Sequence, residues 1–245
     1  MDETTIRSLN EINRRFYETV AVEFDSSRQK PWEGWERIVE QIRAGVPNEV
    51  WLRPAPTPFT VLDVGCGNGR FGRFLADQIG KERLRYVGID SSAALLERAK
   101  TALEGIDARL EQRDIVESPL DAALGEFDMV ALFGVLHHIP GADRRLALVR
   151  ALGERVAPGG VLVFTEWRFL DVATLRARVV PWAANLQVEA GDCLLDWRRG
   201  ETALRYCHFV DDAEHERLVE ASGLKRVEEF RADATNRYTV LRRVE

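Results

Sequence analysis

Residues 58–167 alternate short apolar runs with segments of helical periodicity, and this alternation constrains the fold more than any other feature. The helical segments are RFGRFLADQIG, SSAALLERAKTALEG and GADRRLALVRALGERVAPGG. The runs that we predict as strands are FTVLDVG, RYVGID, ARLEQRDI, FDMVALFGV and VLVFTEW. Near-continuous apolar strands separated by helices are typical of a parallel sheet covered on both faces. We therefore expect an α/β fold of the Rossmann-like kind.

The flanks of this region follow different patterns. Residues 1–57 are predicted as a helical N-terminal cap of two helices, with Pro31 in the first turn of the second and an extended connector after Pro47. Residues 58–245 would form the main domain, with an insertion of weak periodicity over about 168–204. After it we expect the segment RYCHFV, a helix around DAEHERLVEASG, and two closing strands, LKRVEEFRA and RYTVLRRV, that pair antiparallel.

Composition excludes several classes of protein. The chain has 245 residues, 45% of them hydrophobic, and a net charge of −6, so it has no overall electrostatic bias toward nucleic acid or anionic membranes. Its three cysteines, at 66, 193 and 207, are too far apart in sequence for a zinc motif or a disulfide framework. The first residues, MDETTIRSLN, are acidic and lack the basic-then-apolar order of a signal peptide, so we expect none, and no apolar run approaches membrane-spanning length. We expect a cytoplasmic protein with no membrane association and no metal.

The segment Asp63–Gly69 is a candidate ligand loop between the first predicted strand and helix. Its glycines at 65, 67 and 69 are spaced G-x-G-x-G, which differs from the G-x-G-x-x-G of dinucleotide sites. Asp63 precedes the first glycine by two residues and would repel a pyrophosphate. The same carboxylate would attract a cationic amino group, such as that of S-adenosylmethionine (SAM).

Two more acids follow the next two predicted strands. Asp90 ends the second strand, where a carboxylate can accept from both hydroxyls of a ribose. Asp114 ends the third strand, where it could accept from an adenine amine while Ile115 packs on the ring. With Asp63, they would converge at the carboxyl ends of the parallel strands, where open sheets bind ligands.

These motifs together resemble the class I SAM-dependent methyltransferases. The resemblance covers roughly 58–167 through LDVGCGNG, VGIDSS, RDI, FDMVALFGVLHHI and VAPGG. It implies a seven-stranded sheet whose last strand is antiparallel, with SAM as the methyl donor and S-adenosylhomocysteine as the product. The implied cofactor residues are Asp63, Gly65, Cys66, Gly67, Gly69, Asp90, Ser91, Asp114, Ile115, Phe133 and Leu136.

Shorter motifs in the flanks resemble the tRNA wobble-uridine carboxymethyl methyltransferases. They are RQKPW at 28–32, the His137–His138 pair, and RYCH at 205–208. That family esterifies a 5-carboxymethyl group on the wobble uridine of tRNA. The resemblance implies that the acceptor carboxylate is bound by Arg28, His138 and Arg205, and that Arg28, Trp32, Trp167, Tyr206 and His208 contact the substrate. Because the two histidines are adjacent, we expect at most one of them to face the pocket.

Two alternatives remain open at this point. The apolar stretch VVPWAANL suits a lid over a small carboxylate or hydroxyl substrate, and a SAM-binding protein without turnover is also compatible with the three acids. Eukaryotic members of the wobble-uridine family carry a lysine-rich insertion and work with a small zinc-containing activator subunit. Residues 168–204 hold five arginines, no lysine and five acids, so their charges cancel. Expected partners are tRNA and a small activator subunit.

Overall fold

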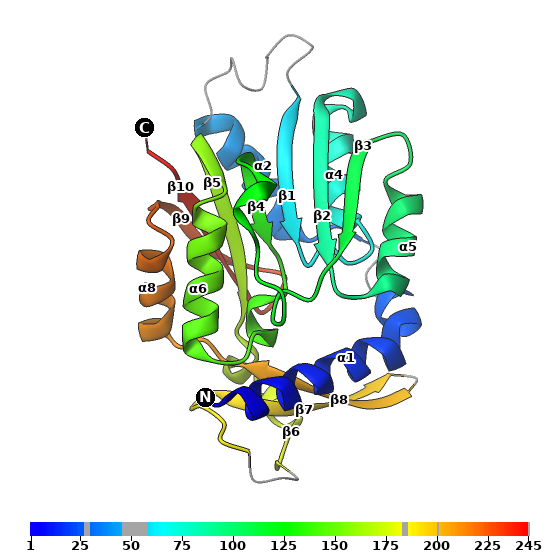
Figure 1. Ribbon diagram of the computed structural model, residues 1–245, viewed down its shortest axis with the longest axis vertical. Helices are drawn as coiled ribbons and strands as arrows, with labels where there is room; N and C mark the ends of the chain where they lie inside the picture. The colour runs from blue at the N-terminus through cyan, green and yellow to red at the C-terminus, as the bar shows by residue number, and fades with distance from the viewer. Residues whose placement is uncertain (27–29, 46–57, 183–185, 200, 245) are drawn as a thin grey trace.

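The computed structural model describes residues 1–26, 30–45, 58–182, 186–199 and 201–244. Its centre is a seven-stranded sheet in the order β3-β2-β1-β4-β5-β10-β9 (Figure 1). The strands are β1 (Phe59–Val64), β2 (Leu84–Asp90), β3 (Asp107–Gln112), β4 (Phe127–Leu132), β5 (Val156–Trp167), β9 (Lys225–Ala232) and β10 (Asn236–Arg242).

The strand directions confirm the predicted class. Strands β1 to β5 pair in parallel, whereas β10 pairs antiparallel with both β5 and β9. The last strand of the chain is therefore inserted antiparallel between β5 and β9. The two closing strands pair as expected, through the turn at Asp233 and Ala234.

Helices cover both faces of this sheet. Alternate strand residues point to opposite sides, so Val61 packs in one core and Leu62 in the other. The first core is closed by α2 (Glu33–Gly45), α4 (Arg70–Ile79) and α5 (Ala93–Ala102). The second is closed by α6 (Ala142–Gly153) and α8 (Asp212–Ala221).

Helix ends follow the local sequence with small differences from the prediction. Ser92 caps α5 by accepting from the amide of Leu95 at 3.3 Å, and Asp211 caps α8 by accepting from Glu214 at 2.7 Å. Pro31 does not lie in the first turn of α2, because that helix begins two residues later, at Glu33. The predicted connector at 47–57 lies outside the described residues.

The remaining elements form a layer across the carboxyl ends of the parallel strands (Figure 1). Helix α1 (Glu3–Ser26) packs against a small antiparallel sheet of β6 (Val179–Val180), β7 (Asp192–Arg199) and β8 (Glu201–His208). A short helix, α7 (Ala173–Arg176), leads into it. The weak periodicity of 168–204 gave no indication of this sheet.

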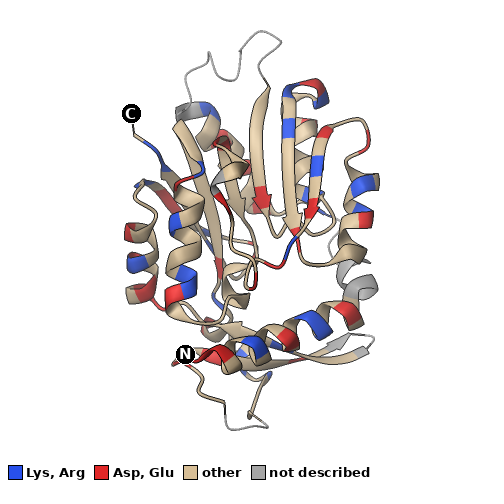
Figure 2. Cartoon of the chain, in the orientation of Figure 1, with Lys and Arg blue, Asp and Glu red and all other residues tan. Residues whose placement is uncertain are grey.

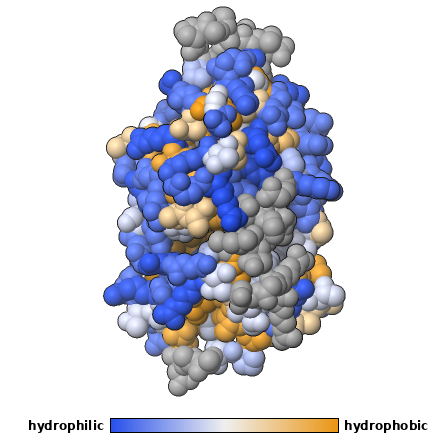
Figure 3. Space-filling view, turned by 90° about the vertical axis from the view of Figure 1, so that its right-hand side faces the viewer, coloured by the Kyte–Doolittle hydropathy of each residue, from blue (hydrophilic) through white to orange (hydrophobic). Residues whose placement is uncertain are grey.

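The surface of the chain is mixed in charge. Lys or Arg and Asp or Glu alternate along α1, α6 and α8 (Figure 2). Apolar side chains gather toward the end that holds the small sheet (Figure 3), where Val179 and Leu204 are exposed. Within the described ranges, no helix is both long and apolar enough to cross a membrane.

Candidate active site

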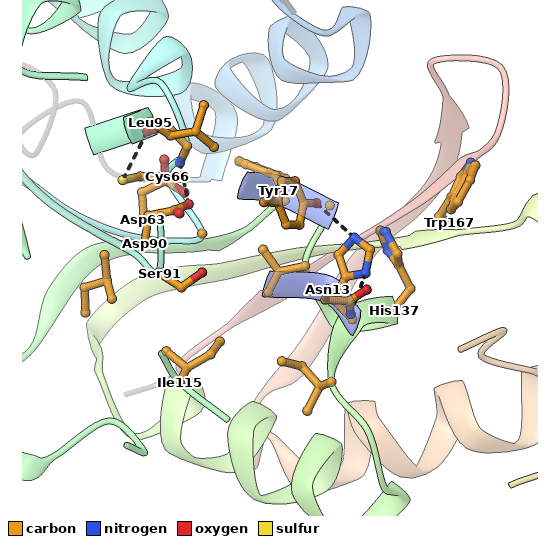
Figure 4. A pocket seen from close by; sticks show the side chains of 18 of the residues that line it. Asn13, Tyr17, Asp63, Cys66, Asp90, Ser91, Leu95, Ile115, His137 and Trp167 are labelled. Carbon is orange, nitrogen blue, oxygen red and sulfur yellow. Dashed lines mark hydrogen bonds between the residues drawn. The ribbon is translucent and has the colours of Figure 1, made fainter. Parts of the chain in front are cut away.

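A cavity of about 290 Å³ lies between the carboxyl ends of β1, β2 and β4 and the layer formed by α1 and β8. Its position is the one at which open parallel sheets bind ligands. Asp63, Cys66 and Asp90 lie on one side of it, His137 and Trp167 on the other, and Asn13 and Tyr17 of α1 between them (Figure 4).

Most of the predicted residues meet in this cavity. From the predicted cofactor set it is lined by Asp63, Gly65, Cys66, Gly67, Asp90, Ser91, Asp114, Ile115 and Phe133. From the predicted acceptor set it is lined by Trp32, His138, Trp167 and Arg205. Arg28 lies outside the described residues.

Two predicted cofactor residues do not line the cavity. Gly69 is the residue before α4, and a Cβ there would meet the backbone of Ala99 at 3.1 Å, so this glycine serves the packing of α4 on α5. Leu136 is fully buried in the core beneath α6. The sequence predicts both residues in the cofactor site, whereas in the structure they pack the scaffold around the cavity.

Two predicted substrate residues also point elsewhere. Arg205 and Cys207 face one side of β8, so Tyr206 and His208 necessarily face the other. The Tyr206 hydroxyl donates to Asp192 at 2.8 Å. His208 lies between Asp192 and Glu214, at 2.7 Å from each, and these hydrogen bonds outweigh burial and raise its pKa. Neither side chain reaches the cavity, because both belong to a buried ionic cluster.

Asp63 is a buried carboxyl group at the end of β1. Burial is the main cause that raises its pKa to about 7, and the nearby Asp90 adds to the rise. The hydroxyl of Tyr86 donates to it at 2.5 Å and opposes the shift, as does Arg70. A cationic ligand group in the cavity would stabilise the charged form of Asp63 and so offset the free energy that burial costs this carboxylate.

The glycine loop is tied to the second acid. Asp90 accepts hydrogen bonds from the amides of Gly67 and Ser92, both at 2.8 Å. Gly65 has a positive φ of 78°, and a Cβ there would come within 2.1 Å of Val135. The loop therefore requires glycine at 65, while Asp90 fixes the loop and keeps lone pairs for a further donor such as a ribose hydroxyl.

Helix α1 supplies residues that the sequence analysis missed. The side chain of Asn10 donates to Asp114 at 2.8 Å, and Asn13 accepts from the amide of Tyr206 at 2.9 Å. Asn10, Asn13 and Tyr17 recur at helical spacing on one face of α1, and this polar stripe was the available signal. An amphipathic pattern alone does not indicate which polar residues of a helix face a ligand, so the stripe did not by itself predict a site.

The sequence analysis expects His138 to bind the acceptor carboxylate through a charge-assisted hydrogen bond, but the ring is not charged in the structure. Burial lowers its pKa to about 3, and Arg205 contributes to the shift, so the ring is neutral. Its Nδ1 lies 3.0 Å from the carbonyl oxygen of Tyr206 and must therefore carry the proton, while Nε2, 3.0 Å away, accepts from the Tyr17 hydroxyl. Neither ring nitrogen of His138 is left to donate to an anion.

Both histidines line the cavity, contrary to the expectation that only one would. They lie in a 3-10 turn (Leu136–His138) with ring centroids 4.1 Å apart, because successive side chains of such a turn do not point in opposite directions as they do in a strand. His137, His138 and Cys207 place their ligand-type atoms within 4.8 Å of one another, as do Glu189, Asp192 and His208. The second group is held by mutual hydrogen bonds and by Arg145.

Arg205 lines the cavity, as do Arg14, Arg70 and Arg113. Its side chain is buried, yet among the described residues it makes no salt bridge and no side-chain hydrogen bond. The guanidinium carbon instead lies over aromatic rings, 4.4 Å from the ring centroid of Trp167 and 5.5 Å from that of Phe16. A buried cation without a protein counter-ion is an electrostatic site for an anion.

Comparison with known proteins agrees with this arrangement. Residues 62–162 match a family model described as a methyltransferase domain. The fold is similar to that of a SAM-bound amino pentose methyltransferase from Micromonospora echinaspora, with a TM-score of 0.62 and 22% identity over 92% of this chain and 97% of the other. The chain is a class I SAM-dependent methyltransferase.

Curated relatives of this methyltransferase differ in their reactions. A carboxy-S-adenosyl-L-methionine synthase from Pseudomonas aeruginosa is 27% identical over 221 residues, or 88% of the methyltransferase and 87% of the relative. A tRNA (carboxymethyluridine(34)-5-O)-methyltransferase from Schizosaccharomyces pombe is 23% identical over 228 residues, or 87% and 89% of the two chains. The methyltransferase uses SAM, and the three acids at the strand ends fit its amino, ribose and adenine groups.

Proposed function

We propose that this methyltransferase esterifies a carboxylate, and that the carboxylate is the 5-carboxymethyl group of a tRNA wobble uridine. The observation that carries the proposal is Arg205, a buried guanidinium that faces the cavity and has no counter-ion within the part of the chain that the structure describes. An acceptor carboxylate would supply the missing charge through two parallel hydrogen bonds.

The chemistry of such a transfer suits the rest of the cavity. Bound SAM supplies an electrophilic methyl group, which passes to the carboxylate oxygen while the sulfur keeps the electron pair and leaves as S-adenosylhomocysteine. A carboxylate at neutral pH needs no general base, and neutral His138 fits that requirement. The contribution of the chain is to hold donor and acceptor in line.

Two further observations support a nucleoside acceptor. The half-buried ring of Trp32 lines the cavity together with Trp35 and Arg70, which pack against it, and this aromatic wall would contact a base. The tRNA methyltransferase relative matches across most of both chains, including the segments that contribute His138 and Arg205.

The test uses labelled SAM and total tRNA that has been treated with mild alkali, which hydrolyses methyl esters and regenerates acceptor carboxylates. We expect label in one nucleoside, released as methanol by a second alkali treatment. Alkali-stable label would mean methylation of nitrogen or of a hydroxyl, and label appearing only in a small-metabolite extract would contradict a tRNA acceptor.

A small carboxylate is the second candidate acceptor, because Arg205 would bind it equally well and the charges of 168–204 cancel. The carboxy-S-adenosyl-L-methionine synthase relatives indicate a further outcome, which the assay detects only when a small-metabolite extract is added as the source of the carboxyl group. Mass analysis of the recovered cofactor would then show SAM with an added carboxyl group and no methylated acceptor.

A further inference from the structure

Three aromatic rings surround the Arg205 guanidinium, and the nearest of them, Trp167, is held by a hydrogen bond of its own. The guanidinium lies 4.4 Å from the Trp167 ring centroid, closer than to Phe16 or Trp197, and no hydrogen bond within the described residues fixes it. A shift of the Trp167 indole would therefore move the nearest surface on which the guanidinium rests.

Trp167 ends β5, and its one polar atom has one partner. The indole Nε1 donates to the hydroxyl of Thr235 at 3.0 Å. Packing against Phe169 and His137, with ring centroids at 5.0 and 5.4 Å, restricts the ring further but does not select which edge faces the β9–β10 turn. The Thr235 hydroxyl makes that selection, because a half-buried indole N–H without an acceptor is costly.

Thr235 is itself held firmly. Its carbonyl accepts from the amide of Arg168 at 2.8 Å, and its amide donates to the carbonyl of Asp233 at 2.7 Å. Asp233 and Ala234 both have positive φ, 53° and 63°, and the Asp233 carboxylate accepts from the amide of Glu33 at the start of α2. The hydroxyl thus projects from a turn anchored to both β5 and α2.

We propose that Thr235, which itself lines the cavity, is a positioning residue for the acceptor site: its hydroxyl orients Arg205 through Trp167. This deepens the proposed function and rests on it only where Arg205 is taken to bind the acceptor carboxylate. The β9–β10 turn, remote in sequence from every motif of the cofactor site, then controls acceptor geometry.

The experiment compares Thr235→Val, which keeps the shape and removes the acceptor oxygen, with Thr235→Ser, which keeps the oxygen. Thr202→Val is the matched control, because Thr202 is exposed on β8 and faces away from the side that carries Arg205. The first readout is the Nε–Hε NMR resonance of Arg205, assigned by its loss in Arg205→Lys. The second is the KM for alkali-treated tRNA, with the Kd for SAM measured alongside.

We expect Thr235→Val to shift or broaden the Arg205 resonance and to raise the acceptor KM roughly two- to tenfold, with the SAM Kd unchanged. Thr235→Ser and Thr202→Val should match the parent protein in both readouts. Trp167→Phe should reproduce the effect of Thr235→Val, and the double variant should add little to either, because both remove the same hydrogen bond.

The outcomes separate this inference from the proposed function. An Arg205 resonance that is unchanged in Thr235→Val, or changed equally in Thr235→Ser, would overturn the positioning role. A resonance that moves in Thr235→Val alone, with tRNA esterification unaffected, would support the positioning role and overturn the assignment of Arg205 to the acceptor.

Discussion

Asn10 of the N-terminal helix donates a 2.8 Å hydrogen bond to Asp114, 104 positions later in the chain. The cap and the adenine end of the predicted cofactor site are therefore in direct contact. Asp114 also accepts from the amide of Val116 at 3.0 Å, so its carboxylate is oriented from both sides before any ligand binds.

The first prediction concerns this contact. Asn10→Ala should weaken SAM binding by about 1 kcal/mol, because it removes one hydrogen bond that orients Asp114 and loosens α1 over the cavity. Calorimetric titration measures the loss, and hydrogen exchange should show faster exchange along α1. Arg15→Ala is the control, since Arg15 is an exposed residue of the same helix. Equal effects of the two variants would remove Asn10 from the site.

The second prediction concerns Asp63 and pH. With a pKa of about 7 its carboxyl group is partly protonated at neutral pH, and the SAM ammonium favours the charged form. SAM binding should therefore release a proton below about pH 7, and affinity should fall by up to roughly tenfold per pH unit below that point.

Calorimetry in buffers of different ionisation enthalpy detects the released proton. Asp63→Asn should bind SAM more weakly and lose the pH dependence. The same group has the opposite effect on the free protein, because the native state binds the proton between the usual pKa of 3.8 and about 7. Stability contributed by Asp63 should thus decrease as pH rises through that window. A SAM affinity that is constant on both sides of neutrality would contradict this assignment.

The third prediction concerns Asp90. Asp90→Asn keeps the size of the side chain but replaces one acceptor oxygen by a donor, which conflicts with the amides of Gly67 and Ser92 and with a ribose hydroxyl. We expect SAM binding to weaken by about 1.5–3 kcal/mol, the usual value of hydrogen bonds to a charged group. Asp107→Asn, at an exposed site on β3, should leave the affinity unchanged.

The fourth prediction separates acceptor classes through Tyr17. Its hydroxyl donates to the lone pair of neutral His138, an arrangement able to relay a proton from an acceptor hydroxyl or amine. A carboxylate needs no such relay, so Tyr17→Phe should change kcat less than about tenfold if the proposed function is right. A loss of about 10²–10⁴-fold is the expectation for general base catalysis and would point to a hydroxyl or amine acceptor instead.

The donor half of the molecule could be predicted from sequence because its signals are local. Strand runs, helix periods and the acids at 63, 90 and 114 all lie within one alternating region, and parallel topology brings the strand ends together. The side of the cavity that we propose for the acceptor could not, because it is assembled from α1, the end of β5 and β8. Contacts such as Asn13 with Tyr206 join residues 193 positions apart.

For two of the predicted site residues that do not line the cavity, the sequence held a signal of this in each case. Arg205 and Tyr206 are adjacent in RYCHFV, and if that segment is read as a strand, alternation places the two side chains on opposite faces. Gly69 directly precedes a predicted helix, where glycine commonly serves backbone geometry. The pairing of β7 with β8 was harder to foresee, because Leu194 and Leu195 are both buried and hide the alternation expected of a strand.

The two faces of strand β8 carry different side chains. Arg205 on one face lines the cavity, whereas Tyr206 and His208 on the other belong to an ionic cluster with Asp192. Any change of one residue in the length of this hairpin would exchange the two sets of side chains. The side chains that now belong to the ionic cluster would then face the cavity, and the Arg205 guanidinium would no longer line it. The ionic cluster beneath β8 thus fixes the register of the hairpin, and with it the side chain that this strand presents to the cavity.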